Sequence, residues 1–187
     1  MRLFIALELD EAVHEQLGLL IDQLRTDAAK IRWVDPGNIH LTLKFLGEVS
    51  DGDVRGVCEA AGEVAAGHGP AEFDVAGVGA FPNPRGARVI WAGVANGSES
   101  LTAAQRALED RLAAAGFRPE GRRFSPHLTV GRVKGIRDRD ALARRLAEYA
   151  DWSADEPQYC DELVVFSSEL RREGAIYTAV HRAPLSG

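Results

Sequence analysis

Short runs in which apolar and polar residues alternate are separated by stretches in which apolar residues recur every three or four positions. Alternate residues share a face in a strand, whereas the helical repeat is about 3.6 residues. The pattern predicts helices at 11–29, 51–66, 99–115 and 138–149, and strands at 2–9, 31–34, 39–46, 73–81, 88–94, 127–133, 159–167 and 175–180. Clusters of Gly, Pro, Asn, Asp and charged residues predict turns between them, the last at 171–174.

The same order of elements recurs when the chain is shifted by 87 residues. The tripeptide His-Leu-Thr at 40–42 falls on the one at 127–129, and the aliphatic run 3–7 falls on 90–94. An internal repeat changes the expected fold. We expect an α+β fold in which 1–187 form one bilobal domain of two duplicated β-α-β-α-β lobes related by a pseudo-twofold axis. Antiparallel sheets would line a central cleft, with helices outside. Repeat 1 would span about 1–83 and repeat 2 about 88–170, followed by a C-terminal strand at 175–180.

Each His-Leu-Thr places its His and Thr on one face of a strand and its Leu on the other. A twofold axis would bring His40, Thr42, His127 and Thr129 to one cleft, with the imidazoles within about 12 Å so that both reach one reacting group. Two imidazoles can act as general base and general acid near neutral pH, and two hydroxyls can donate hydrogen bonds to an anion. The near-symmetry of the repeat leaves open which histidine is the acid.

Neighbouring positions supply further candidates. By alternation Lys44 shares the face of His40 and is a candidate substrate contact. Arg132 has the opposite parity in its strand, so it reaches the cleft only if the strand ends or bulges there. Trp33 or Phe81 could stack on a base. The remaining histidines are interpreted as surface residues: His14, His68 and His181.

Charge and composition narrow the class of protein. The net charge of −6 disfavours a grip on long nucleic acid, but residues 117–145 carry nine Lys and Arg against three acidic residues, which suits a small anionic group. No apolar run approaches the ~20 residues of a membrane span, and the N-terminal run is too short and acidic for a signal peptide. Cys58 and Cys160 lie in no metal or redox motif, so we expect reduced thiols and a cytoplasmic protein. No metal-ligand motif lies near either His-Leu-Thr, and we expect neither metal nor cofactor.

With the two motifs in a duplicated chain, the sequence resembles the 2H phosphoesterase superfamily. The closer resemblance is to its bacterial and archaeal RNA 2′,3′-cyclic phosphodiesterase branch, also described as 2′-5′ RNA ligases. It rests on residues that span nearly the whole chain: 2–7, 40–47, 81–82, 88–94, 124–132, 168–170 and 174–177. Gly131 stands where alanine is expected.

The resemblance implies hydrolysis of RNA 2′,3′-cyclic phosphate ends to 2′-phosphomonoesters, with reversible 2′-5′ joining of RNA ends. It implies that His40 is the proton donor and His127 the proton acceptor, and that Thr42 and Thr129 hold the phosphate. The expected partners are RNA 3′ ends or nucleotide cyclic phosphates, with no membrane and no obligate protein partner. Two alternatives stay open: a cyclic phosphodiesterase of small nucleotides, and a non-catalytic RNA-binding protein on the same fold. The basic segment favours RNA, and intact His and Thr in both copies favour an enzyme.

Overall fold

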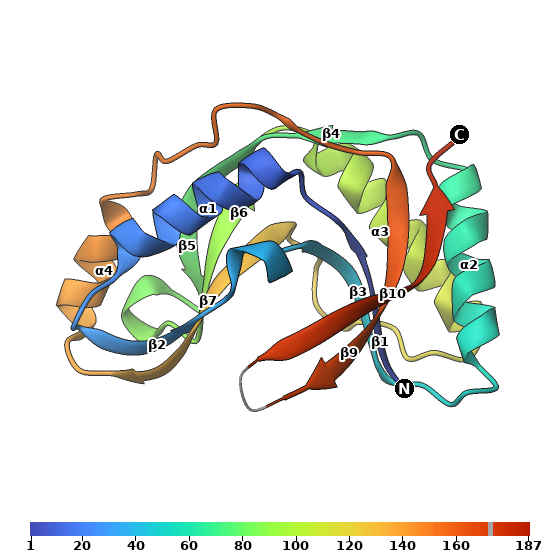
Figure 1. Ribbon diagram of the computed structural model, residues 1–187, viewed down its shortest axis with the longest axis horizontal. Coiled ribbons are helices and arrows are strands. Elements are labelled where there is room, and N and C mark those ends of the chain that lie inside the picture. Colours follow the sequence, from blue (N-terminus) through green and yellow to red (C-terminus); the bar gives the residue numbers. More distant parts are fainter. Residues whose placement is uncertain (172–173) are drawn as a thin grey trace.

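The structure is a computed structural model that describes residues 1–171 and 174–187. Strands and helices follow one another closely along the chain (Figure 1). The helices are α1 Glu11–Leu24, α2 Val54–Ala66, α3 Ser98–Ala114 and α4 Arg139–Ala147, with 3-10 turns at Pro36–Asn38 and Pro84–Gly86. The strands are β1 Arg2–Leu7, β2 Ala29–Trp33, β3 Leu41–Glu48, β4 Ala71–Phe73, β5 Val75–Phe81, β6 Val89–Val94, β7 His127–Ile136, β8 Gln158–Cys160, β9 Glu162–Leu170 and β10 Ala175–Pro184.

Each element that the pattern predicted is present, with some shifted ends, but the single strands expected at 73–81 and 159–167 are each divided in two, because β4 and β8 pair with each other in a separate ribbon while β5 and β9 join the main sheet. Helix α1 ends at Leu24 rather than at residue 29, because the polar residues that follow break the apolar stripe and the Thr26 hydroxyl accepts a hydrogen bond from the backbone of Ala28 at 3.2 Å. The strand expected at 39–46 begins at Leu41, so His40 immediately precedes it. The turn expected at 171–174 includes residues 172–173, which lie outside the described residues.

The main sheet is antiparallel and has the order β10-β9-β1-β3-β7-β6-β5, with β2 also paired to β7. It confirms the α+β prediction, but the two repeats exchange strands. The last strand of repeat 1, β5, pairs with β6 of repeat 2, and β9 of repeat 2 pairs with β1 of repeat 1. Neither repeat therefore completes its own half of the sheet, which the sequence alone did not indicate.

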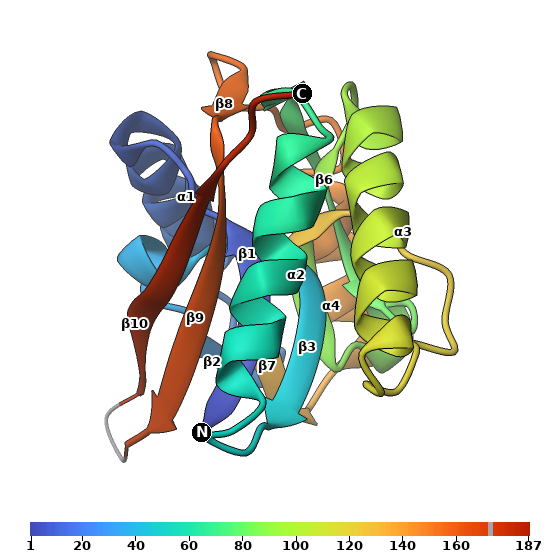
Figure 2. The same ribbon diagram turned by 90° about the vertical axis from the view of Figure 1, so that its right-hand side faces the viewer.

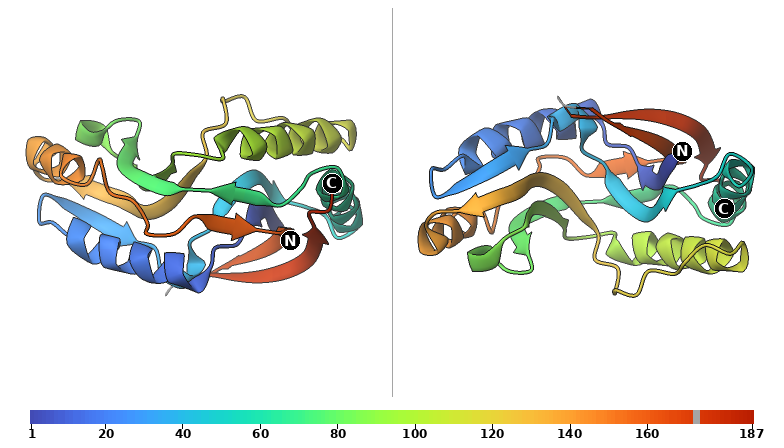
Figure 3. Two further views of the ribbon diagram at one scale, coloured as in Figure 1. Left: turned by 90° about the horizontal axis from the view of Figure 1, so that it is seen from above. Right: turned by 90° about the horizontal axis from the view of Figure 1, so that it is seen from below.

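Two strand pairings lie on the pseudo-twofold relation itself. Leu41 pairs with Leu128, and in the separate β4–β8 ribbon Glu72 pairs with Tyr159. Both pairs join residues that are 87 positions apart. A residue that pairs with its own equivalent lies at the axis, so the two His-Leu-Thr segments meet there. In agreement, α1 and α3 lie on opposite sides of the central strands, and α2 and α4 lie at opposite ends of the molecule (Figure 3). That 1–187 form one domain of two repeats stays a prediction, which these pairings support.

The helices cover the sheet with apolar faces. Residues Val13, Leu17, Leu20, Ile21 and Leu24 of α1 are buried at helical spacing. Helix α2 packs beside α3 and against β9 and β10, and α3 also contacts β3, whereas α4 packs on β5 (Figure 2). One continuous core joins both halves of the sheet. Among the described residues, no helix is both long and apolar enough to cross a membrane.

A β-bulge interrupts the motif strand in each repeat. Ala6 pairs with Thr42 and Ile5 with Lys44, which leaves Leu43 without a partner in β1. The second copy repeats this: Trp91 pairs with Thr129 and Ile90 with Gly131, which leaves Val130 unpaired. A bulge places two residues of one strand opposite one of the other, so the alternation of side chains reverses beyond it.

The two bulges also correct the alignment of the first strands. Ala6 and Trp91 occupy equivalent places opposite the two threonines, an offset of 85 rather than 87. The ungapped match of 3–7 onto 90–94 is therefore not the structural equivalence.

Candidate active site

The register at the axis brings both motifs onto one face. Because Leu41 pairs with Leu128 in antiparallel register, His40 lies opposite Thr129 and Thr42 lies opposite His127. Directly opposite Cβ atoms are about 4.5–5.5 Å apart and diagonal residues about 7–8 Å apart. The two histidines occupy the diagonal positions, which is close enough for both rings to reach one phosphorus. Leu41 and Leu128 point the other way and are fully buried.

Each imidazole is oriented by the same backbone contact. The Nδ1 of His40 donates to the carbonyl oxygen of Asn38 at 2.9 Å, and the Nδ1 of His127 donates to that of Ser125 at 2.7 Å. A carbonyl can only accept, so the neutral ring carries its proton on Nδ1 and leaves Nε2 with a free lone pair. Both rings thus turn the nitrogen that can exchange a proton away from the backbone.

The surroundings of His40 are strongly apolar. Its ring stacks on Phe4, with centroids 4.7 Å apart, and more distantly on Phe166, at 6.2 Å. The ring of Tyr177 meets it edge-on, with centroids 5.2 Å apart. Burial in this cluster lowers the pKa of His40 to about 4, against an opposing effect of the Asn38 hydrogen bond. Free of ligand, His40 is therefore neutral at pH 7.

His127 lies outside that cluster. Its ring contacts Phe81 edge-on, with centroids 5.0 Å apart, and its hydrogen bond to Ser125 is exposed to solvent. The two halves of the site are thus symmetric in register and in Nδ1 contact, but three aromatic rings surround His40 and one contacts His127 among the described residues. This difference comes from Phe166 of β9 and Tyr177 of β10, whose rings lie beside His40.

The expectation that Lys44 shares the face of His40 is wrong. The bulge at Leu43 turns Lys44 into the interior, where it is 5% exposed. Its Nζ donates to both carboxylate oxygens of Glu109, at 2.8 and 2.7 Å, and to the carbonyl oxygen of Arg118 at 3.0 Å. Lys44 therefore anchors the segment that leads to His127 instead of pointing into the cleft, and Phe45 takes the cleft position.

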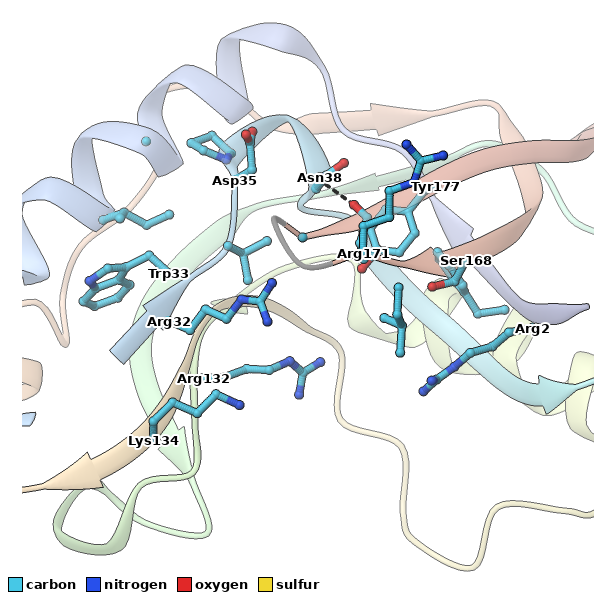
Figure 4. A pocket seen from close by; sticks show the side chains of 18 of the residues that line it. Arg2, Arg32, Trp33, Asp35, Asn38, Arg132, Lys134, Ser168, Arg171 and Tyr177 are labelled. Atoms are coloured by element: carbon cyan, nitrogen blue, oxygen red, sulfur yellow. Dashed lines mark hydrogen bonds between the residues drawn. The ribbon is translucent and has the colours of Figure 1, made fainter. Parts of the chain in front are cut away.

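Arg132 does reach the cleft, because the equivalent bulge at Val130 reverses the parity of its strand. It lines a cavity of about 1020 Å³ that also borders Phe4, Asn38 and Tyr177, the residues in contact with His40. The charge of Arg132 contributes to the lowered pKa of His40. Figure 4 shows Arg32, Arg132 and Lys134 extending from adjacent strands into this cavity. Its placement thus makes Arg132 available as a substrate contact.

Several residues near the site were not predicted from the sequence. His14 is not a plain surface residue: its Nε2 donates to the carbonyl oxygen of Ile39 at 2.9 Å, next to His40. Phe4 and Tyr177 were read only as strand residues, and their role as walls for His40 depends on strand pairing. Of the two aromatic residues that the sequence offered to stack on a base, Trp33 lines the cavity and Phe81 lies against His127. Within 1–171 and 174–187, no three His, Cys, Asp or Glu side chains form a group that could hold a metal.

Comparison with known proteins matches the chain to one family. The model of LigT-like phosphoesterases matches residues 7–91 and again residues 93–177. The RNA 2′,3′-cyclic phosphodiesterase of Methanothermobacter thermautotrophicus is 40% identical over 177 residues, which is 95% of each chain. The crystal structure of TT0787 of Thermus thermophilus superposes with a TM-score of 0.83 at 25% identity, covering 100% of this chain and 99% of that one. E. coli LigT complexed with 3′-AMP superposes with a TM-score of 0.75 at 25% identity, covering 100% and 98%.

Proposed function

Because the chain belongs to the family of LigT-like phosphoesterases, we propose that it hydrolyses 2′,3′-cyclic phosphates at RNA 3′ ends to 2′-phosphomonoesters. The observation that carries the proposal is the pair of histidines at the pseudo-twofold axis. Both fix Nδ1 on a carbonyl and leave Nε2 free beside a threonine from the other motif.

In the reaction, a water oxygen attacks phosphorus as the bond from phosphorus to the 3′ oxygen breaks. His127 accepts the proton of the water at Nε2, and His40 donates a proton from Nε2 to the departing 3′ oxygen. Thr42 and Thr129 donate hydrogen bonds to the non-bridging oxygens, which gain charge in the transition state. Side chains of these types need no metal to move the two protons.

For His40 to act as the acid, it must be protonated in the complex although it is neutral in the free protein. The negative phosphate supplies the difference, because an anion beside the ring favours the imidazolium and raises its pKa. The half-buried His127, whose Nδ1 is held by Ser125, accepts the proton of the water at Nε2. Joining of RNA ends follows the same path with a 5′-hydroxyl in place of water, which yields a 2′-5′ bond.

RNA 3′ ends are the proposed substrate, because the relative from M. thermautotrophicus, which aligns with 95% of this chain, is an RNA 2′,3′-cyclic phosphodiesterase. The cavity of about 1020 Å³ that borders the neighbours of His40 has room for a whole nucleotide as well as its cyclic phosphate. Both cysteines, Cys58 and Cys160, are free thiols, which is in keeping with a reducing cytoplasm.

The test is product analysis with an oligoribonucleotide that ends in a 2′,3′-cyclic phosphate, incubated with the protein in excess EDTA. We expect a 2′-phosphomonoester as the single product. No turnover would refute the enzymatic function, a 3′-phosphomonoester would refute the assignment of the leaving oxygen, and turnover lost only with EDTA would refute metal independence.

A further inference from the structure

The cavity beside His40 contains more positive charge than the acid–base reaction requires. Arg32, Arg132 and Lys134 line it, and none of the three forms an ion pair with a carboxylate of the described residues. Three further arginines line it: Arg25 and Arg171 are paired with Asp22 and Glu169, and Arg2, which has no ion pair among the described residues, extends from β1 on the other side of the cavity (Figure 4). The first three cations therefore form a group without a protein counter-charge, which we call the basic row.

The basic row is built by strand pairing. Arg32 of β2 is the direct antiparallel partner of Arg132 of β7, so both side chains leave the sheet on the same face. Lys134 lies two residues further along β7, at a shift of register between Lys30 and Ile31. Like charges directly opposite one another are unfavourable in a sheet. An anion bound between the cations would relieve the repulsion between their charges.

The basic row also has a direction. Arg132 is close enough for its charge to act on His40, Arg32 lies beside it on β2, and Lys134 lies two residues further along β7, away from His127. A 3′-terminal nucleotide has one further anionic group beyond its cyclic phosphate, namely the phosphate on its 5′ oxygen. A chain held with its terminus at the histidines therefore needs a second anion site at one nucleotide's distance.

We propose that Arg32 and Lys134 form a subsite for the phosphate on the 5′ side of the terminal nucleotide. The inference rests on the proposed function, because it takes the terminal phosphate to lie at the histidines. The subsite makes the protein prefer a nucleotide that carries a 5′-phosphate over one that ends in a 5′-hydroxyl.

The test compares the binding of two small ligands by calorimetry. Adenosine 2′-phosphate carries only the product phosphate, and adenosine 2′,5′-bisphosphate adds the second anion. We expect the bisphosphate to bind about fivefold more tightly to the wild type, the upper range for one exposed ion pair. In the Arg32→Gln/Lys134→Gln variant the ratio falls to about one.

The matched control is Arg55→Gln/Arg106→Gln, which removes the same charge from exposed positions on α2 and α3 and keeps the fivefold ratio. Equal binding of both ligands by the wild type, or a fivefold ratio retained without Arg32 and Lys134, overturns the subsite. A protein that shows the ratio but hydrolyses no cyclic phosphate refutes the proposed function and leaves the subsite standing, so the two failures are distinguishable.

Discussion

The lowered pKa of His40 predicts a loss of stability in acid that one substitution relieves. The folded protein holds this ring with a pKa of about 4, whereas an unfolded chain has a value of 6.5. Between these values the unfolded state binds the proton and the folded state does not, so stability falls as pH decreases from about 6.5 to 4. The substitution His40→Gln removes the titrating ring and should remove this part of the acid loss.

The size of the effect follows from the difference of the two pKa values. At 1.36 kcal/mol for each pKa unit, the whole difference corresponds to about 3 kcal/mol, and about 2 kcal/mol of it is lost between pH 7.5 and pH 5. The aromatic residues that cause it are Phe4, Phe166 and Tyr177, which exclude water from the ring.

Urea denaturation at pH 7.5 and at pH 5 measures the effect. We expect the free energy of unfolding of the wild type to fall by about 2 kcal/mol more than that of His40→Gln between these conditions. The control is His127→Gln, which removes the other imidazole outside the aromatic cluster and retains the acid loss. An equal fall in the wild type and in His40→Gln would refute the reasoning.

The same ring can be followed directly by NMR. Its titration midpoint should lie near pH 4 in the free protein and rise when adenosine 2′-phosphate is bound, because the phosphate favours the imidazolium. A midpoint that stays near 4 with the ligand bound would contradict the assignment of His40 as the proton donor.

Three further predictions concern the supporting structure. Lys44→Met leaves the partly buried carboxylate of Glu109 without its cation, so urea denaturation should show a loss of about 3 kcal/mol. Most of this loss should be recovered in Lys44→Met/Glu109→Leu. A single variant as stable as the wild type would argue against the ion pair. Gly131→Ala brings a Cβ to 2.9 Å from side-chain atoms of β2 and should cost about 1–3 kcal/mol in the same assay; an unchanged stability would contradict tight packing of β2 on β7. Burial raises the pKa of Cys160 to about 12, so a thiol reagent at pH 8 should modify Cys58 first and Cys160 only on unfolding; early modification of Cys160 would show that its site opens.

Much of the fold could be predicted because strand and helix periods are local properties of the sequence. The apolar stripe of α1 and the alternation around both His-Leu-Thr segments placed the elements correctly. The 87-residue repeat then indicated that the two segments meet, and the pairing of Leu41 with Leu128 shows that they do.

The errors arose where geometry depends on a partner strand. A bulge at Leu43 is a shift of register against β1, which no pattern within β3 reveals, and it reversed the orientation predicted for Lys44. The same event in β7 brought Arg132 into the cleft. The exchange of β5 and β9 between repeats is likewise a matter of pairing.

The unequal settings of the two histidines could not be predicted from two nearly identical motifs. They arise because β9 and β10 place Phe166 and Tyr177 beside His40, and these strands lie more than 120 positions away along the chain. The sequence therefore indicated the pair, and the tertiary structure distinguishes its members.

The most direct test of the two-histidine account is a single-turnover rate measured on an oligoribonucleotide with a 2′,3′-cyclic phosphate end. We compare the wild type with His40→Ala and with His127→Ala. The matched control is His181→Ala, on the edge strand β10. The account predicts a loss of about 10²–10⁴-fold in each of the first two variants and an unchanged rate in the control. A rate within threefold of the wild type in either His40→Ala or His127→Ala would contradict it.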